Sequence, residues 1–582
     1  MHDTPIATLV LAAFASVCLQ ASAQPLAPER PSGWRDQAPV TSRHWMVAAA
    51  NPLAVEAATR MLNEGGSAVD AAIAAQLVLG LVEPQSSGLG GGAVMLVHDA
   101  RTKKLIAYDG RETAPAAATP DRFMRDGRPM EFYDAVIGGR SVGVPGTVRL
   151  LAVAHRQHGR LAWARLFAPA IRLAEQGFAV SPRLHTLVAG ESHFNQPRAR
   201  AYFFGIDERP IGAGVVLRNP AYAATLRRIA AGGADAFYRG AIAQDVVDTA
   251  NAASSNPGDL TLADLANYEV KVREPICEPY RSYRVCGMPL PSSGGVTVLQ
   301  MLKILEPYDL AAMGPATFWS VHFISEAGRL AFADRGVYEA DPDFYAPPAG
   351  LLDADYLRDR ATLIRPDTSM RRASPGRPPE RNAAANKAAW GNDTAPEFPS
   401  TSHISIVDRY GDAVAMTSTI EDAFGSRLLT QSGFLLNNEL TDFSFAPSED
   451  GKLVANRVQA GKRPRTSMSP TIAYDRHGRL AIVTGSPGGP AIINYVVKAL
   501  VGIIDWNLDP QAAAALPNFG SRNGPTELEK DTAIVALAPK LAALGAEVRI
   551  VDQTSGVQAI VRTQHGWSGG TDPRREGIVR GD

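Results

Sequence analysis

Thr401 and Thr419 are the residues whose types and spacing most directly suggest chemistry. An N-terminal threonine has a nucleophilic hydroxyl and an α-amine that can act as its general base, and a second hydroxyl nearby can orient the first. The preceding stretch, about 365–400, is rich in Pro and Arg and follows no helical or strand period, which predicts an exposed linker. A cut between Ser400 and Thr401 would supply such a threonine. The alternative is an ordinary linker leading into an ordinary hairpin.

A β-hairpin is expected to bring the two threonines together. Residues 401–408 and 412–419 alternate as strands do, and Gly411 can supply the positive φ of a three-residue loop. The resulting register pairs Ile404 with Met416 on an apolar face. On the opposite, polar face it places the two threonines across from each other at the open end.

Two further segments offer backbone and hydroxyl groups for a site. Gly488 and Gly489 lie between a strand and an apolar helix expected at 491–504, where N–H groups can hold an oxyanion. A plain strand-to-helix turn is the alternative. Thr466 and Ser467 are adjacent hydroxyls in a loop, which alone is a weak signal.

Charged residues in two other segments could bind a charged head group. Glu439 and Asp442 lie three apart, which suits an ammonium ion, although solvated surface charge has the same pattern. Arg111 could hold a carboxylate with two parallel hydrogen bonds, or pair with Glu112 or Asp109 at the surface. The sequence has no metal-ligand spacing and no dinucleotide or phosphate-loop fingerprint, so we expect neither a metal nor an organic cofactor.

Composition and the N-terminal segment indicate a soluble exported protein. The net charge of −1 over 582 residues argues against nucleic acid or an acidic membrane as the main partner. Residues 6–19 form an apolar run too short to span a bilayer, and a small-residue cleavage pattern follows at 21–23. We therefore expect residues 1–23 to be a secretory signal and the mature protein to be periplasmic or secreted, without a membrane anchor.

Cys277 and Cys286 flank a segment that is expected to fold as a hairpin turning at residues 281–282. This register sets the two cysteines directly opposite each other, at a separation that a disulfide can bridge in an oxidising compartment. Two free buried thiols are the alternative. Cys18 would leave with the signal segment.

Periodicity predicts helices in one part of the chain and strands in another. Helical patterns occur at 52–62, 67–82, 145–158, 162–176, 295–306, 316–334 and 491–504. Beyond Thr401 the pattern is mostly strands until about residue 482. Such segregation favours an α+β layered fold.

Several segments together resemble the γ-glutamyltranspeptidase family of N-terminal-nucleophile hydrolases, over essentially the whole mature chain. The matching segments are Glu64–Ala72, Leu89–Gly92, Arg111–Pro115, Pro291–Gly295, Thr401–His403, Leu436–Asn438, Lys462–Thr471 and Thr484–Gly489. The resemblance implies a four-layer αββα sandwich made as one precursor. It further implies a cut before Thr401 into a large subunit (about 24–400) and a small subunit (401–582) that remain together as a heterodimer.

The resemblance also implies a role for each candidate residue. Thr401 would be the nucleophile both for self-cleavage and for catalysis, with Thr419 supporting its hydroxyl. The substrate α-carboxylate would be held by Arg111, Thr466 and Ser467. Its α-ammonium would be held by Glu439 and Asp442, and the oxyanion by Gly488 and Gly489.

Three departures from the family pattern concern the substrate head group and the acceptor. Glu421 stands where the family usually has Asn, and Thr466 replaces the first Ser of the hydroxyl pair. The segment 444–461, where bacterial relatives carry a lid loop, is short. The hairpin register places Glu421 on the same face as Thr419, pointing into the donor pocket. The alternative is that it turns outward and pairs with an arginine such as Arg427.

The expected reaction is acyl transfer through a γ-glutamyl ester on Thr401, with glutathione as the leading donor and water or an amino acid or peptide amine as the acceptor. A related amidohydrolase or acylase acting on another small dicarboxylic amide, such as a glutaryl compound, is a close alternative. A non-catalytic periplasmic binding protein with the same fold is a third, which the retained Thr401, Thr419 and glycine turn disfavour.

Overall fold

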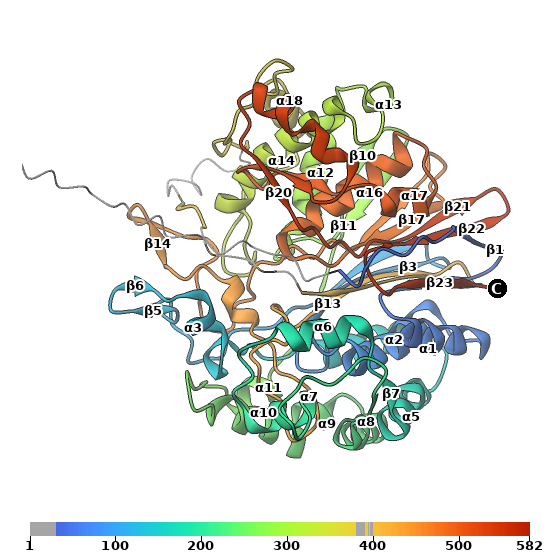
Figure 1. The fold of residues 1–582 in the computed structure, drawn as a ribbon, viewed down its shortest axis with the longest axis vertical. Coiled ribbons are helices and arrows are strands. Elements are labelled where there is room, and N and C mark those ends of the chain that lie inside the picture. The colour runs from blue at the N-terminus through green and yellow to red at the C-terminus, as the bar shows by residue number, and fades with distance from the viewer. Residues whose placement is uncertain (1–30, 380–389, 394, 396–397, 399) are drawn as a thin grey trace, which may run out of the picture.

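Two seven-stranded antiparallel sheets lie face to face at the centre of the molecule (Figure 1). The computed structural model describes residues 31–379, 390–393, 395, 398 and 400–582, so the expected signal segment lies outside the described residues. The first sheet contains, from edge to edge, β1 (Val40–Ser42), β22 (Gly566–Thr571), β21 (Gln558–Thr563), β17 (Leu480–Gly485), β16 (Thr471–Tyr474), β11 (Tyr283–Gly287) and β10 (Ile276–Tyr280). The second contains β23 (Ile578–Gly581), β2 (Met46–Ala49), β12 (Ser402–Val407), β13 (Ala413–Thr419), β3 (Gly92–Asp99), β4 (Lys104–Gly110) and β9 (Lys271–Arg273).

Helices cover the outer face of each sheet, which completes four layers (Figure 1). The second sheet is covered by α1 (Pro52–Asn63), α2 (Ala68–Val82) and α4 (Thr147–His158). The first is covered by α12 (Ser293–Leu305), α16 (Ile492–Ile504) and α17 (Pro510–Ala515), with α14 (Phe318–Tyr338) packed on α12. Apolar side chains fill the space between the sheets and beneath both helical layers. The expected αββα sandwich is confirmed.

The other elements are short or peripheral. The remaining α-helices are α3 (Phe132–Val136), α5 (Ala168–Gln176), α6 (Pro182–Gly190), α7 (Pro197–Phe203), α8 (Pro220–Gly232), α9 (Asp235–Tyr238), α10 (Ala241–Asn251), α11 (Leu262–Ala266), α13 (Leu310–Met313), α15 (Ala354–Ala361) and α18 (Ala538–Ala543). The remaining strands are β5 (Met124–Arg125), β6 (Arg128–Pro129), β7 (Phe178–Ala179), β8 (Val216–Leu217), β14 (Ser448–Glu449), β15 (Lys452–Leu453), β18 (Phe519–Gly520), β19 (Thr526–Glu529) and β20 (Val548–Val551). No helix among the described residues is both long and apolar enough to cross a membrane.

The hairpin β12–β13 lies at the centre of the second sheet, and its register is the predicted one. Ile404 pairs with Met416, and a three-residue loop with Gly411 at φ +90° joins the strands. The apolar face packs under α2, in the same core cluster. The polar face meets the first sheet, where the ring of His403 covers Gly485. Burial lowers the pKa of His403 to about 3, so this imidazole is neutral and packs between the sheets.

The second predicted hairpin, β10–β11, forms one edge of the first sheet. Cys277 lies directly opposite Cys286, and the two are joined by a disulfide with an S–S distance of 2.07 Å. The turn falls at Arg281, whose φ is +52°. The expected bridge is therefore confirmed, and the alternative of two free thiols is wrong.

Two regions differ from the sequence-based expectation. Residues 420–470 form mainly loops, with a short 3₁₀ turn at Glu439–Asp442, instead of the expected strands. Positive φ at Glu421, Phe424 and Arg427 prevents a continuous strand there. In the expected linker, residues 365–379 have no regular structure and are mostly exposed, but the carboxylate of Asp393 further along is fully buried and pairs with Arg465 at 3.0 Å.

Candidate active site

Thr401 and Thr419 lie together at the open end of the central hairpin, next to the Ser400 carbonyl. The Thr401 hydroxyl lies 3.5 Å from that of Thr419, and both hydroxyls donate to the Ser400 carbonyl oxygen, Thr419 at 2.9 Å. Thr401 is only 3% exposed. The backbone N–H of Glu421 donates to the Thr419 hydroxyl at 2.9 Å and thereby fixes its orientation. Two threonine hydroxyls and a backbone carbonyl group are thus in contact.

Most of the sequence-predicted site residues line one pocket around these threonines. Those that line it are Thr401, Thr419, Glu421, Glu439, Asp442, Thr466, Ser467 and Gly489, with Ser400 on the same wall. Arg111 and Gly488 do not line it. The chain therefore gathers hydroxyls, carboxylates and a helix-entry glycine from five separate segments at one point.

Arg111 lies behind the carboxylates of the pocket. Its side chain is fully buried, and the guanidinium donates to both Glu439 and Asp442, which are the residues expected to hold an ammonium group. It also donates to the backbone carbonyl of Arg465 at 3.0 Å. The alternative pair with Glu112 is present at 3.6 Å, but it is buried and does not lie at the surface. In this arrangement Arg111 fixes the two carboxylates and does not itself face the pocket.

Glu421 points into the pocket, as the hairpin register predicts. It is 3% exposed, and its carboxylate accepts hydrogen bonds from Asn438 and, at 3.4 Å, from Thr441. Burial raises the pKa of Glu421 well above its usual value, and the nearby carboxylates, with Asp442 first, raise it further. The alternative of an outward pair with Arg427 is wrong.

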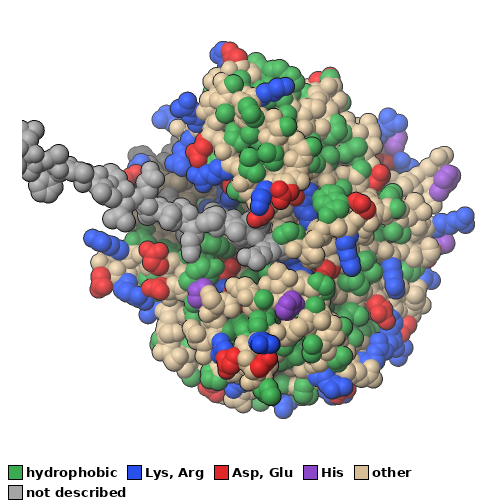
Figure 2. Space-filling model, in the orientation of Figure 1, with side chains coloured by type: hydrophobic (Ala, Val, Ile, Leu, Met, Phe, Trp, Pro, Cys, Tyr) green, Lys and Arg blue, Asp and Glu red, His purple; other side chains and the backbone are tan. Residues whose placement is uncertain are grey.

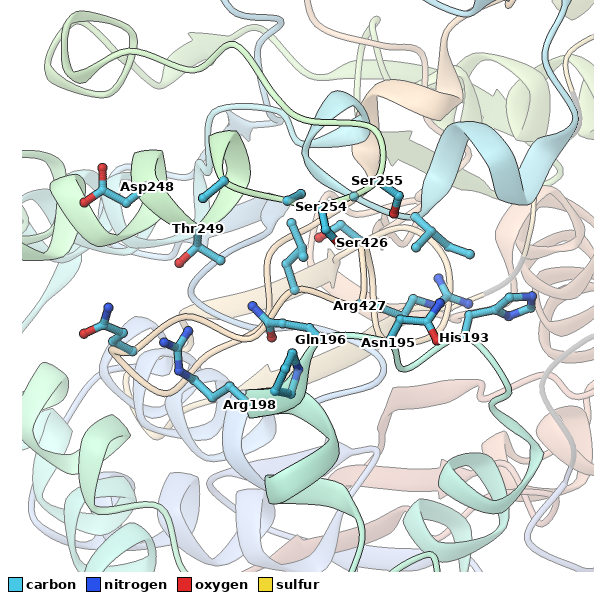
Figure 3. A pocket seen from close by; sticks show the side chains of 17 residues that line it. His193, Asn195, Gln196, Arg198, Asp248, Thr249, Ser254, Ser255, Ser426 and Arg427 are labelled. Carbon is cyan, nitrogen blue, oxygen red and sulfur yellow. The ribbon is translucent and has the colours of Figure 1, made fainter. Parts of the chain in front are cut away.

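Arg427 instead holds two other carboxylates, at 2.7 Å from Asp422 and 2.9 Å from Glu191. It lines a separate cavity of about 360 Å³. Figure 3 shows Arg427 close to Asn195 and His193 at one end of this cavity, with Asp248 at the other. None of the sequence-predicted site residues lines this cavity.

The hydroxyl loop at Thr466–Ser467 is held by the large N-terminal part of the chain. Ser293 donates to the carbonyl of Thr466 from both its backbone N–H and its hydroxyl, at 2.8 and 2.7 Å. Arg335, which is 5% exposed, donates to the Ser467 hydroxyl at 2.7 Å and to the Ser293 hydroxyl at 2.8 Å. Sequence reasoning missed Arg335, because it lies 132 residues from Ser467 and no local pattern joins them.

The glycine turn before α16 has the conformation that its sequence suggests. Gly488 has φ +133° and Gly489 has φ +55°, and a Cβ on Gly488 would lie 2.6 Å from the ring of Tyr495. A side chain at 488 is therefore excluded both by backbone conformation and by space. The turn leads through a 3₁₀ segment into α16, so its N–H groups lie at the entrance of a helix.

The run Gly90–Gly92 is needed for close packing behind the nucleophile. A Cβ on Gly91 would lie 2.1 Å from the carbonyl oxygen of Thr419, and one on Gly90 would lie 2.1 Å from that of Leu435. Asn437 then ties the two sides together by donating to the carbonyl of Gly90 at 2.7 Å. The described residues contain no group of three or more His, Cys, Asp or Glu side chains arranged to hold a metal ion.

Known proteins are similar to this chain in both sequence and fold. The family model for gamma-glutamyltranspeptidase matches residues 54–581. The glutathione hydrolase proenzyme of Bacillus subtilis is 36% identical over 518 residues, covering 88% of this chain and 86% of the relative. The acylase ACY 1 proenzyme of Pseudomonas sp. strain V22 is 34% identical, covering 85% and 86%. The crystal structure of a cephalosporin acylase from Bacillus halodurans superposes with a TM-score of 0.82 at 28% identity, covering 94% of this chain and 97% of that one.

The four-layer sandwich and its structural neighbours place the protein among the N-terminal-nucleophile hydrolases. Within that class, the chain belongs to the gamma-glutamyltranspeptidase family and is an enzyme. The expected enzyme is therefore confirmed, and the alternative of a non-catalytic binding protein is wrong. Both signs of charge are interspersed over the visible face of the molecule, in keeping with the net charge of −1 (Figure 2).

Proposed function

We propose that the protein cuts itself between Ser400 and Thr401 and then hydrolyses or transfers γ-glutamyl groups through an ester on Thr401. The observation that carries the proposal is the contact of the Thr401 and Thr419 hydroxyls with the Ser400 carbonyl oxygen. Attack of the Thr401 hydroxyl on that carbonyl carbon transfers the acyl group from nitrogen to oxygen. The hydrogen bond from Thr419 offsets the negative charge that develops on the oxygen. Water then hydrolyses the ester and leaves Thr401 with a free α-amine.

In the processed enzyme the same hydroxyl attacks the γ-amide carbonyl of a donor. The α-amine of Thr401 takes the hydroxyl proton and returns it to the departing amine. The N–H groups of Gly488 and Gly489 hold the oxyanion. Water or an amine acceptor then releases the γ-glutamyl group. Glutathione is the donor we propose first, as the glutathione hydrolase relatives support.

The pocket residues supply recognition of the donor head group. Glu421, Glu439 and Asp442 surround the position of the α-ammonium, and Thr466 and Ser467 hydrogen-bond the α-carboxylate. Arg111 adds positive charge behind the donor head group. Its buried contacts keep the carboxylates of Glu439 and Asp442 in place. We further propose that the protein is exported after removal of residues 1–23, and that subunits 24–400 and 401–582 remain together.

An acylase acting on another small dicarboxylic amide is the second candidate, since an acylase proenzyme is 34% identical over a similar span. A donor panel separates the two. With γ-glutamyl, glutaryl and short aliphatic amides, we expect kcat/KM to be highest for the γ-glutamyl amide. The glutaryl amide lacks the α-ammonium and would leave the surplus of pocket carboxylates without a cationic ligand. Faster turnover of the glutaryl amide would favour the acylase.

A further inference from the structure

A group of aromatic side chains lies beside the Thr401 pocket, where Phe398 of the pocket lining stacks on one of them. We call Phe132, Tyr133 and Phe445 the aromatic shelf. Phe132 and Tyr133 are adjacent on α3 and half-buried, whereas Phe445 is almost fully buried beneath them. The rings of Phe132 and Phe445 are nearly parallel, with centroids 6.4 Å apart. Phe445 is in turn stacked on the buried Phe123 at 4.9 Å, so the shelf has a firm base.

The other half of the shelf is held equally firmly. Tyr133 stacks on His193 at 4.6 Å with an interplanar angle of 17°. The guanidinium of Arg427 lies 5.6 Å from the Tyr133 ring centroid and is itself fixed by its two carboxylate partners. His193 and Arg427 both line the 360 Å³ cavity (Figure 3), so the shelf borders residues of that cavity.

In the uncut chain, the shelf is occupied by a residue of the segment that precedes the nucleophile. Phe398 stacks on Phe132 with centroids 4.0 Å apart, lies 6.1 Å from Tyr133, and lines the pocket of Thr401. Because Phe398 precedes Thr401 by three positions, their Cα atoms lie within about 11 Å of each other. Phe398 therefore shows that the shelf accepts an aromatic ring next to the Thr401 pocket.

We propose that the aromatic shelf is a subsite for an aromatic ring on the amine half of the donor, and on the acceptor amine in transfer. This rests on the proposed function and requires that the tail ending at Ser400 leave the pocket after cleavage. The acyl half is excluded from the shelf by its chemistry, because its free end carries an ammonium and a carboxylate. Those charges match the side chains of Glu421, Glu439 and Ser467 in the pocket, not an apolar surface.

Two donors with the same acyl half and different amine halves test the proposal. We expect processed wild-type enzyme to turn over γ-glutamyl-phenylalanine with a kcat/KM about tenfold above that of γ-glutamyl-alanine, the scale of one buried and stacked ring. Phe132→Ala and Phe132→Leu should lose most of this preference and keep kcat/KM for γ-glutamyl-alanine within about twofold. Phe344→Ala, at a phenylalanine that is 40% exposed and lies outside the shelf, is the matched control and should keep the preference.

The outcomes separate the subsite from the reaction. If wild-type enzyme turns over neither donor, the proposed function fails. If it turns over both equally, or if both Phe132 variants keep the wild-type preference, the subsite is overturned while the reaction stands. Should a Phe132 variant remain uncut, the wild-type acceptor comparison decides. Phenylalanine should resolve the acyl-enzyme faster than alanine, and equal rates would overturn the proposal.

Discussion

Two buried ionic clusters in this protein have opposite electrostatic character. In the first cluster, the guanidinium of Arg574 is paired with Glu529 at 2.7 Å and with Asp572 at 3.1 Å. Burial alone would raise the pKa of Asp572, but Arg574 and Lys498 outweigh it, and the pKa lies below the usual value. The charges in this cluster compensate each other within the fold.

The cluster around Arg111 has a surplus of carboxylates. One guanidinium is paired with Glu112, Glu439 and Asp442, and Glu421 lies beside them. Burial and the neighbouring carboxylates raise the pKa of both Glu112 and Glu421 well above the usual value. Such a cluster is costly in the folded chain unless a proton or a cationic ligand neutralises it. A compensated cluster is therefore structural, whereas a cluster with surplus charge marks a place for a ligand.

The largest expected effect comes from removing the nucleophile beside the surplus cluster. Thr401→Ala should remain a full-length chain without detectable activity, since one hydroxyl serves both cleavage and catalysis. A denaturing gel should show one band, and mass spectrometry should find that the wild-type small subunit begins at Thr401. The melting temperature of the Thr401→Ala variant should stay close to that of the wild-type protein. A cut or active Ala variant would sink the assignment of the nucleophile.

Breaking the compensated cluster should reduce stability instead of activity. Arg574→Met leaves two buried carboxylates without their partner, and we expect a loss of about 3–5 kcal/mol in the free energy of unfolding. Urea denaturation in the uncut Thr401→Ala chain measures it. Arg549→Met is the matched control, because Arg549 and its partner Glu547 are both more than half exposed, and it should change stability by less than about 0.5 kcal/mol. Equal effects of the two variants would contradict the comparison.

Arg111→Lys should weaken the donor site while keeping the charge. An ammonium group cannot replace a planar guanidinium that reaches Glu439 and Asp442 at once. We expect kcat/KM to fall about 10²-fold, the scale of roughly 3 kcal/mol for charge-assisted contacts. Self-cleavage, followed as the appearance of the small subunit, should persist because no donor takes part in it. Wild-type kcat/KM in the Lys variant would mean that the fork geometry is not required.

The parts of the site that sequence could predict are those with local patterns. The register of β12–β13 follows from alternation and loop length, so the meeting of Thr401 and Thr419 was predictable. The facing cysteines of β10–β11 follow in the same way. The pairing of Arg111 with Glu439 joins residues 328 apart in the chain. Such contacts depend on how layers pack, and no local period encodes them.

The loops after β13 were the least predictable part of the fold. Residues 420–470 contain enough residues with high strand propensity to suggest strands. Their backbone is instead held by hydrogen bonds from side chains and not by pairing with a neighbouring strand. Asn437, for example, bonds backbone groups of Gly90 and Gly143 on two other segments. These long-range hydrogen bonds determine the loop conformation and thereby place Glu439 and Asp442 in the pocket.

Replacing Glu421 in the surplus cluster should have the smallest effect. Because the folded-state pKa of Glu421 is raised above its unfolded value near 4.5, the folded chain holds a proton that the unfolded chain has lost. Stability contributed by this group is therefore lost as pH rises from about 4.5 through the raised pKa. Glu421→Asn removes that loss. It should be more stable than wild type at neutral pH, and the difference should shrink towards pH 4.5.

Activity should follow the same titration. Ionised Glu421 attracts the donor ammonium, so part of the acid limb of the wild-type kcat/KM profile reports its protonation. In Glu421→Asn that contribution is absent, and the acid limb should move to lower pH. Self-cleavage should continue, and kcat/KM near pH 8 should stay within about tenfold of the wild-type value. Glu547→Gln, at an exposed carboxylate, is the control and should leave the profile in place. If the Asn variant keeps the wild-type profile and donor KM, then Glu421 carries no charge that the donor senses, and Glu439 and Asp442 alone hold the ammonium.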